Sequence, residues 1–172
     1  ASVSQKYRIP HIWRGESEEK IGQSMMNAEA SGDTAFMVTK VVLDPHAGEI
    51  AVGRLFSGTV KKGDQLYVAG MPAANRVQSV GMFVGGDRIS TENVTAGNII
   101  AVSGLRDAIS GSTISYDKEM TAFERIIHNS EPVVTTAIET KQTKDLPRLV
   151  GVLRAVANAD STIQIDSKLE TG

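Results

Sequence analysis

Basic side chains are the residues of this sequence whose types and spacing could bind a ligand. Lys61 and Lys62 stand between Gly58 and Gly63, where the pattern predicts the tip of a hairpin. Because lysine and arginine bind phosphate oxygens without reading bases, basic residues that converge on one face would bind a nucleic-acid backbone. The alternative is that hairpin lysines only maintain solubility and protect strand edges. The candidates for RNA contact are Arg54, Lys61, Lys62, Arg76, Arg88 and Arg106.

The motifs needed for nucleotide binding or hydrolysis are incomplete in this sequence. Residues 53–58, GRLFSG, have the glycine spacing of a phosphate-binding loop, but Thr59 and Val60 replace the lysine and the serine or threonine that should follow. Residues 110–112, SGS, lack the outer glycines of a nucleophile elbow. The sequence therefore predicts no catalytic and no cofactor-binding residue in this chain.

Composition limits the remaining classes of function. The chain has 172 residues, of which 41% are hydrophobic and 22% charged, as in ordinary globular domains. Its net charge of −2 gives no general attraction to nucleic acid, so any contact must come from a local basic patch. There is no cysteine, and the three histidines lie in separate predicted loops, which predicts no metal site. These histidines are His11, His46 and His128.

The sequence also predicts a cytoplasmic protein that does not bind membranes. No stretch approaches the roughly 18 apolar residues that a membrane-spanning helix needs. The first residues lack the charged-then-apolar pattern of a secretory signal.

Residues 1–32 are predicted to form a linker and a short helix. Residues 1–15 show no sustained period and contain Pro10 and Gly15, which favours an extended segment. Residues 16–30 carry apolar residues near helical spacing, and Glu16, Glu18 and Glu19 suit the first turn of a helix. The apolar side chains that should anchor the linker are Tyr7, Ile9, Ile12 and Trp13.

Residues 33–116 are predicted to be a small antiparallel β-barrel, which makes the chain mainly β. Glycine recurs at positions 48, 53, 58 and 63, and glycine within strands usually marks a bulge or a close backbone approach. Six short strands at regular spacing are typical of a barrel or sandwich, and closure of the sheet would remove exposed edges. The predicted strands are residues 35–43, 50–57, 65–69, 77–84, 98–103 and 113–115.

Residues 117–172 are predicted to be a connector followed by a partial α+β segment. Residues 132–139 alternate like a strand, residues 144–158 carry one apolar stripe of a helix, and residues 161–166 suit a second strand. Asp145 is the expected N-cap, with Pro147 in the first turn. Because two strands and one helix are marginal alone, we expect this βαβ unit to be cut from a larger domain.

Five stretches, taken in order, resemble the elongation factor 2 family of archaeal and eukaryotic translational GTPases. They are YRIPHIW at 7–13, HAGEIAVGRLFSGTVKKGD at 46–64, VGGDRI at 84–89, AGNIIAVSGL at 96–105 and EPVVTTAIETKQTKDLPRLVGVLR at 131–154. The resemblance implies a fragment made of the barrel called domain II and the start of domain III, a ferredoxin-like half, next to an absent GTPase domain.

The resemblance also implies a function. The family moves transfer RNA and messenger RNA through the ribosome, driven by GTP. The fragment would then be a non-catalytic module that docks on RNA and protein of the small ribosomal subunit and contacts other domains of its parent. GTP and Mg²⁺ would bind only in the absent domain.

Three alternatives remain open at this stage. The barrel could belong to another translational GTPase, such as an initiation or release factor, although residues 131–154 resemble the translocase specifically. It could be a stand-alone β-barrel protein-interaction module, or a small enzyme, for which no set of catalytic residues is present.

Overall fold

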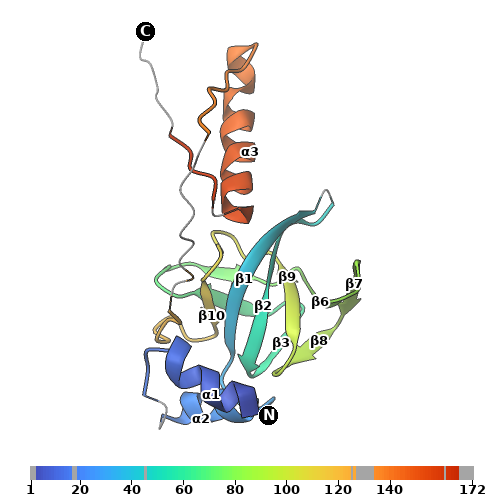
Figure 1. Ribbon diagram of the computed structural model, residues 1–172. Helices are drawn as coiled ribbons and strands as arrows, with labels where there is room; N and C mark the ends of the chain where they lie inside the picture. Colours follow the sequence, from blue (N-terminus) through green and yellow to red (C-terminus); the bar gives the residue numbers. More distant parts are fainter. Residues whose placement is uncertain are drawn as a thin grey trace.

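The computed structural model describes residues 3–16, 19–44, 46–124, 126, 134–160 and 162–166. The helices are α1 (Val3–Ile12), α2 (Lys20–Asn27), the short 3₁₀ helix η1 (Thr143–Asp145) and α3 (Leu146–Ala159). The strands are β1 (Ala35–Asp44), β2 (Gly48–Ser57), β3 (Thr59–Lys61), β4 (Gln65–Val68), β5 (Ala74–Arg76), β6 (Ser79–Val84), β7 (Asp87–Thr91), β8 (Asn93–Thr95), β9 (Ile99–Ser103) and β10 (Thr113–Ser115). Figure 1 shows α1 and α2 near one end of β1 and β2, with α3 near the other end.

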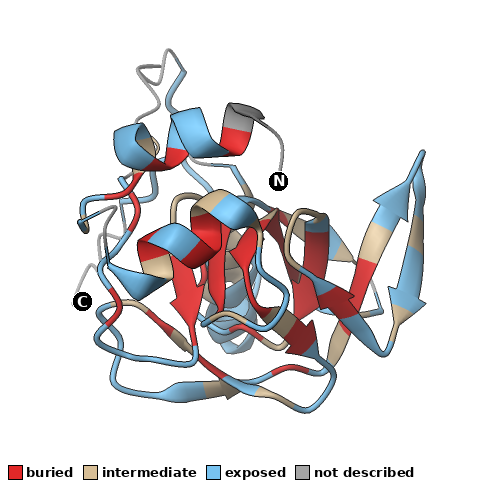
Figure 2. Cartoon of the chain, turned by 90° about the horizontal axis from the view of Figure 1, so that it is seen from below, coloured by how far each residue is buried: buried red, intermediate tan, exposed pale blue. Residues whose placement is uncertain are grey.

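The strands form a curled antiparallel sheet around one core, which confirms the mainly β class. Eight strands follow the order β5-β4-β10-β1-β2-β9-β6-β7, and β3 pairs with β8 in a separate small sheet. Val60 of β3 and Val94 of β8 pack into the same core as Phe36, Leu55 and Ile100 of the larger sheet. The buried residues concentrate in these strands (Figure 2). Both sheets therefore enclose one hydrophobic interior.

The prediction that strand pairing closes the sheet is wrong. β5 and β7 lie at the two ends of the strand order and do not pair with each other. The segment between β5 and β6 links the two ends of the sheet instead. Val77 continues the pairing with the chain before β4 through bonds of 2.9 Å each to Gly63 and Asp64, and the Gln78 N–H donates to the Ser103 carbonyl of β9 at 2.9 Å. Val77 is 1% exposed, so this segment crosses the core between the two pairings.

The predicted close approach at a strand glycine is confirmed at Gly53. The register between β1 and β2 shifts between Val38 and Lys40, which marks a bulge, and Gly53 pairs with Val38 at that point. A Cβ atom on Gly53 would lie 1.9 Å from the Met37 carbonyl oxygen. Only glycine therefore fits here without displacing β1, and the bulge increases the local bend of the strands.

The linker predicted to be extended is instead helix α1. Gln5, Ile9 and Trp13 are spaced four residues apart and are all buried, which is the repeat of one helix face. Ile9 and Trp13 pack in a second cluster with Met25 of α2 and Phe56 of β2. Pro10 lies in the last turn, where its missing N–H removes one helical hydrogen bond. Burial of the helix face outweighs that cost, and the prediction of an extended segment was wrong.

Gln5 joins α1 to two other elements through its buried side-chain amide. Its Nε2 donates to the carbonyl oxygen of Phe56 at 3.0 Å and to that of Met25. Its Oε1 accepts a hydrogen bond from Arg54 Nη2 at 2.9 Å. Both ends of the amide are therefore satisfied, which is what a buried polar group requires.

Helix α2 confirms the predicted short helix but begins later than expected. It starts at Lys20, and Glu19 is its N-cap residue, so no acidic residue occupies its first turn. It ends at Asn27, and the C-cap residue Ala28 has a left-handed φ of 52° and donates its N–H to the Met25 carbonyl. In the sequence, the acidic residues Glu16, Glu18 and Glu19 indicated a helix start more clearly than the Ala28 cap indicated its end.

In the last part of the chain only the helix matches the prediction. α3 confirms the helix, but Asp145 is itself helical, at φ −87° and ψ −7°, because η1 precedes it, and its side chain makes no capping bond. The predicted strands are wrong where the structure describes them, since residues 134–139 and 162–166 form no strand. Val134 and Ile163 are exposed. A strand needs a neighbour for its backbone bonds, and neither segment has one among the residues that the structure describes.

We predict that Gln5→Ala destabilises the chain more than a substitution of an exposed glutamine does. The change leaves the Met25 and Phe56 carbonyl groups buried without their donor, so we expect a loss of about 1–3 kcal/mol in the free energy of unfolding. Urea unfolding of the 172-residue chain measures it. Gln65→Ala, at an exposed site on β4, is the control, and equal losses for both variants would contradict the role of Gln5.

Candidate nucleic-acid interface

The two lysines lie in a turn that connects two different sheets. Lys61 is the last residue of β3, which pairs with β8 and not with β4. The predicted hairpin tip is therefore wrong, although the predicted turn between strands is present. We call Lys61–Asp64 the basic turn. Gly63 adopts a φ of +93°, a left-handed conformation that glycine allows without strain.

Hydrogen bonds from several elements fix the backbone of the basic turn. The Lys62 N–H donates to the Glu92 carbonyl at 3.0 Å, and the Gly63 N–H donates to the Val77 carbonyl at 2.9 Å. The Lys61 N–H donates to Asp64 Oδ2 at 2.7 Å. The turn is thereby held by the residue between β7 and β8, by the segment before β6 and from within, so its position is set before any ligand binds.

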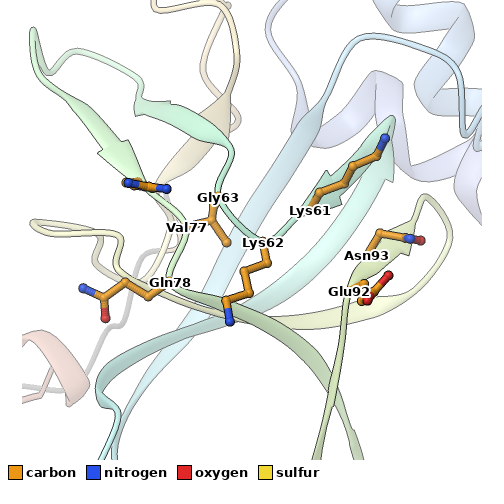
Figure 3. A pocket seen from close by; sticks show the side chains of 8 residues that line it. Lys61, Lys62, Gly63, Val77, Gln78, Glu92 and Asn93 are labelled. Atoms are coloured by element: carbon orange, nitrogen blue, oxygen red, sulfur yellow. The ribbon is translucent and has the colours of Figure 1, made fainter.

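The basic turn forms one wall of an open hollow of about 910 Å³, which we call the basic hollow. Figure 3 shows Lys61 and Lys62 leaving the turn in different directions, with Gln78 on one side and Glu92 and Asn93 on the other. Further residues that line the hollow are Gly63, Arg76 and Val77.

The hollow carries an excess of positive charge. Lys61, Lys62 and Arg76 line it against one carboxylate, that of Glu92. The ion pairs found in the described part of the chain are Arg14–Glu124 and Lys118–Glu119, so the three cationic side chains of the hollow are unpaired there. Exposed, unpaired cationic side chains on a fixed backbone are well placed to bind the phosphate oxygens of a nucleic-acid backbone.

Arg106 does not line this hollow. Its backbone N–H donates to the side-chain oxygen of Asn75 at 2.9 Å, and Asn75 precedes Arg76 in β5. Because neighbouring side chains of a strand point to opposite faces, this contact places Arg106 on the other face of β5 from the Arg76 side chain. The structure brings together three of the six predicted basic residues, Lys61, Lys62 and Arg76.

The other two basic residues are engaged within the chain. Arg54 is held by Gln5 at 2.9 Å on the side of the sheet that α1 covers. Arg88 Nη2 donates to Ser79 Oγ, which in turn lies 2.6 Å from Ser103 Oγ. The Nε of Arg88 is buried without a hydrogen-bond partner. Neither side chain lines the basic hollow, so their partners inside the chain account for them.

Asp64 and Tyr116 belong to the site although basic composition did not point to them. The Tyr116 hydroxyl donates to Asp64 Oδ2, the same oxygen that accepts the Lys61 N–H. Burial has the largest effect in raising the pKa of Tyr116 above its ordinary value of 10.0, and the hydrogen bond to Asp64 adds to it. The hydroxyl is therefore protonated and available as a donor at neutral pH. The only signal in the sequence was the turn-forming Gly63-Asp64 pair.

The remaining polar candidates have structural partners or lie apart. His11 Nδ1 donates to the Tyr7 carbonyl at 2.7 Å, His46 is exposed in the β1–β2 turn, and His128 lies outside the described residues. Ser110 Oγ donates to the Thr39 carbonyl at 2.8 Å. Across the described ranges no three histidine, aspartate or glutamate side chains gather as metal ligands. No helix in those ranges is long and apolar enough to span a membrane.

Known proteins match the chain along nearly its whole length. The family model of elongation factor Tu domain 2 matches residues 48–115, from the start of β2 to the end of β10. The chain is 56% identical over 170 residues to Elongation factor 2 of Thermoplasma volcanium and 54% identical over 170 residues to that of Thermoplasma acidophilum. It is 55% identical over 169 residues to that of Methanosarcina thermophila. These matches cover 98–99% of this chain but only 23% of each relative.

Asp44 allows a test of the turn between β1 and β2 by pH. The N–H groups of Ala47 and His46, at 2.8 Å from Oδ1, hold the pKa of the Asp44 carboxyl below its ordinary 3.8, with a smaller effect from Arg88. A lowered pKa in the folded state adds stability above the unfolded pKa, and this stability is lost as the pH falls through the folded pKa.

We therefore predict that Asp44→Asn is less stable than the unaltered chain at neutral pH. The difference should be constant down to about pH 4 and should shrink below it, as the native carboxyl becomes protonated. Urea unfolding at a series of pH values measures both curves. A difference that persists unchanged to about pH 2 would contradict the assignment to the ionised carboxyl.

Proposed function

The chain belongs to the elongation factor 2 family over the length that it shares with those relatives, and on that premise we propose that it docks such a factor on the ribosome. The observation that carries the proposal is the identity of 54–56% over 98–99% of the chain to archaeal Elongation factor 2. The chain spans about a quarter of those relatives, 23% of their length. The activity of the whole factor, GTP-driven translocation of transfer RNA and messenger RNA, is part of the proposal.

The contact surface that we propose is the basic hollow. Three unpaired cationic side chains on a fixed turn neutralise phosphates without reading bases, which suits the backbone of structured RNA. Ribosomal RNA of the small subunit, with neighbouring ribosomal protein, is the proposed partner. Since the chain as a whole carries a net charge of −2, this local concentration of charge also orients the encounter.

The chain itself is proposed to contribute no catalysis. Residues 53–58 have the glycine spacing of a phosphate-binding loop. They form the second half of β2 and the residue after it, and no helix follows them directly. GTP and Mg²⁺ are proposed to bind in another part of the parent protein, in the cytoplasm. The proposed division is a linker with its helix at 1–32, the barrel at 33–116 and the start of the next domain at 117–172.

A different translational GTPase, such as an initiation or release factor, is the weaker alternative. The family model for the barrel stops at residue 115 and describes a domain that such factors could share. The match to Elongation factor 2, however, continues through almost all of the remaining chain. That continuation supports the translocase family over its neighbours.

We predict that Lys61→Ala/Lys62→Ala/Arg76→Ala weakens ribosome binding by the full-length factor. Each lost phosphate contact reduces the slope of log K against log salt concentration by about 0.7–0.9, so three contacts reduce it by roughly 2–3. Binding of the factor to purified ribosomes at several salt concentrations measures both affinity and slope.

The matched control removes the same charge elsewhere. Lys6, Arg8 and Lys40 are exposed and do not line the hollow, so Lys6→Ala/Arg8→Ala/Lys40→Ala should keep the slope of the unaltered factor. GTP binding by the free factor should be equal in all three proteins. The surface is wrongly assigned if the control loses as much affinity and slope as the hollow variant.

A further inference from the structure

Asp64 connects the basic turn to the segment that follows the barrel. One of its oxygens, Oδ2, accepts the N–H of Lys61 at 2.7 Å and the hydroxyl hydrogen of Tyr116. Tyr116 follows the last residue of β10, Ser115, whose neighbour across the sheet is Tyr67 of β4. A single carboxylate oxygen thus ties Lys61 to a residue more than fifty positions away in sequence.

The charge of Asp64 opposes phosphate binding. A carboxylate beside Lys61 and Lys62 repels an approaching anion and lowers the local positive potential. A sequence shaped only by attraction to phosphate would have no acid at this position. The hydrogen bonds of Asp64 supply a compensating benefit, because a turn held in one conformation loses less entropy when its side chains bind.

We infer that Tyr116 and Asp64 are positioning residues for phosphate binding at the basic hollow, an inference that rests on the function proposed above. Tyr116 touches no ligand in this arrangement. Its hydroxyl orients the Asp64 carboxylate, the carboxylate holds the Lys61 N–H, and the turn then presents both lysine side chains from a fixed backbone. The benefit appears as affinity, with no change in the number of phosphates contacted.

Tyr116→Phe tests the inference without changing charge. The side chain is 44% exposed, so loss of one hydroxyl should leave the fold intact. We expect the full-length factor to bind ribosomes roughly 3- to 10-fold more weakly, the range of one hydrogen bond of this kind, with the salt slope unchanged. Tyr67→Phe is the matched control, because no hydrogen bond of the Tyr67 hydroxyl is found in the described part of the chain.

Asp64→Ala separates positioning from electrostatics by the sign of its effect. Removing the carboxylate makes the hollow more positive, so electrostatics alone predicts tighter binding. Loss of the turn's anchor predicts weaker binding, and this is the result we expect. The double variant Tyr116→Phe/Asp64→Ala should bind no more weakly than Asp64→Ala alone, since the hydroxyl has then already lost its acceptor.

The outcomes distinguish this inference from the proposed function. Normal binding by Tyr116→Phe, or tighter binding by Asp64→Ala, overturns the positioning role while the effect of Lys61→Ala/Lys62→Ala/Arg76→Ala remains. If that triple variant binds normally, the docking surface itself is wrong. All variants are compared below the melting temperature measured by circular dichroism, so weaker binding does not reflect unfolding.

Discussion

The backbone hydrogen bonds of Val77 and Gln78 are the constraint on which both the core and the candidate site depend. β5 and β7 end the sheet without pairing, and the segment between β5 and β6 connects the two ends of the strand order. Val77 in this segment bonds to Gly63 and Asp64 beside β4, while Gln78 bonds to Ser103 of β9. Gly63 and Asp64 belong to the basic turn, so the bonds that connect the two ends of the sheet also fix the backbone from which the lysines project. Stability and the proposed ligand contact are therefore joined at one point of the barrel.

The distribution of basic residues follows from which face of the sheet is covered. α1 and α2 cover the outer side of β1 and β2, and Arg54 on that side becomes a structural partner of Gln5. Arg88, in the edge strand β7, is held by Ser79. The uncovered turn after β3 keeps its cations free for a partner. Basic residues of similar appearance in the sequence thus have different roles, which depend on what packs against them.

Regular alternation and turn residues predicted the longer strands well. β1, β2, β6 and β9 were anticipated because they are apolar segments at regular spacing, with glycines and other turn residues near their ends. β7 and the three-residue strands β3, β5 and β8 were missed, whereas β10, equally short, was anticipated. Short strands exist through their partners, and the residues within them give no dependable signal. α1 was missed because Pro10 concealed its four-residue repeat. The strands expected on either side of α3 did not form where the chain is described, since pairing is a tertiary property that alternation alone does not supply.

The candidate site was half visible in the sequence. Cationic residues can be counted, but convergence depends on strand order, which placed Arg76 beside Lys61 and Lys62 and left Arg88 elsewhere. The contribution of Tyr116 depends on a contact across fifty residues that no local pattern reveals.

Trp13 carries a different consequence. It is the only tryptophan in the chain, is 4% exposed, and donates its indole N–H to the Thr121 carbonyl at 2.8 Å. Its fluorescence therefore provides a built-in optical reporter of whether the segment after the barrel stays docked on α1.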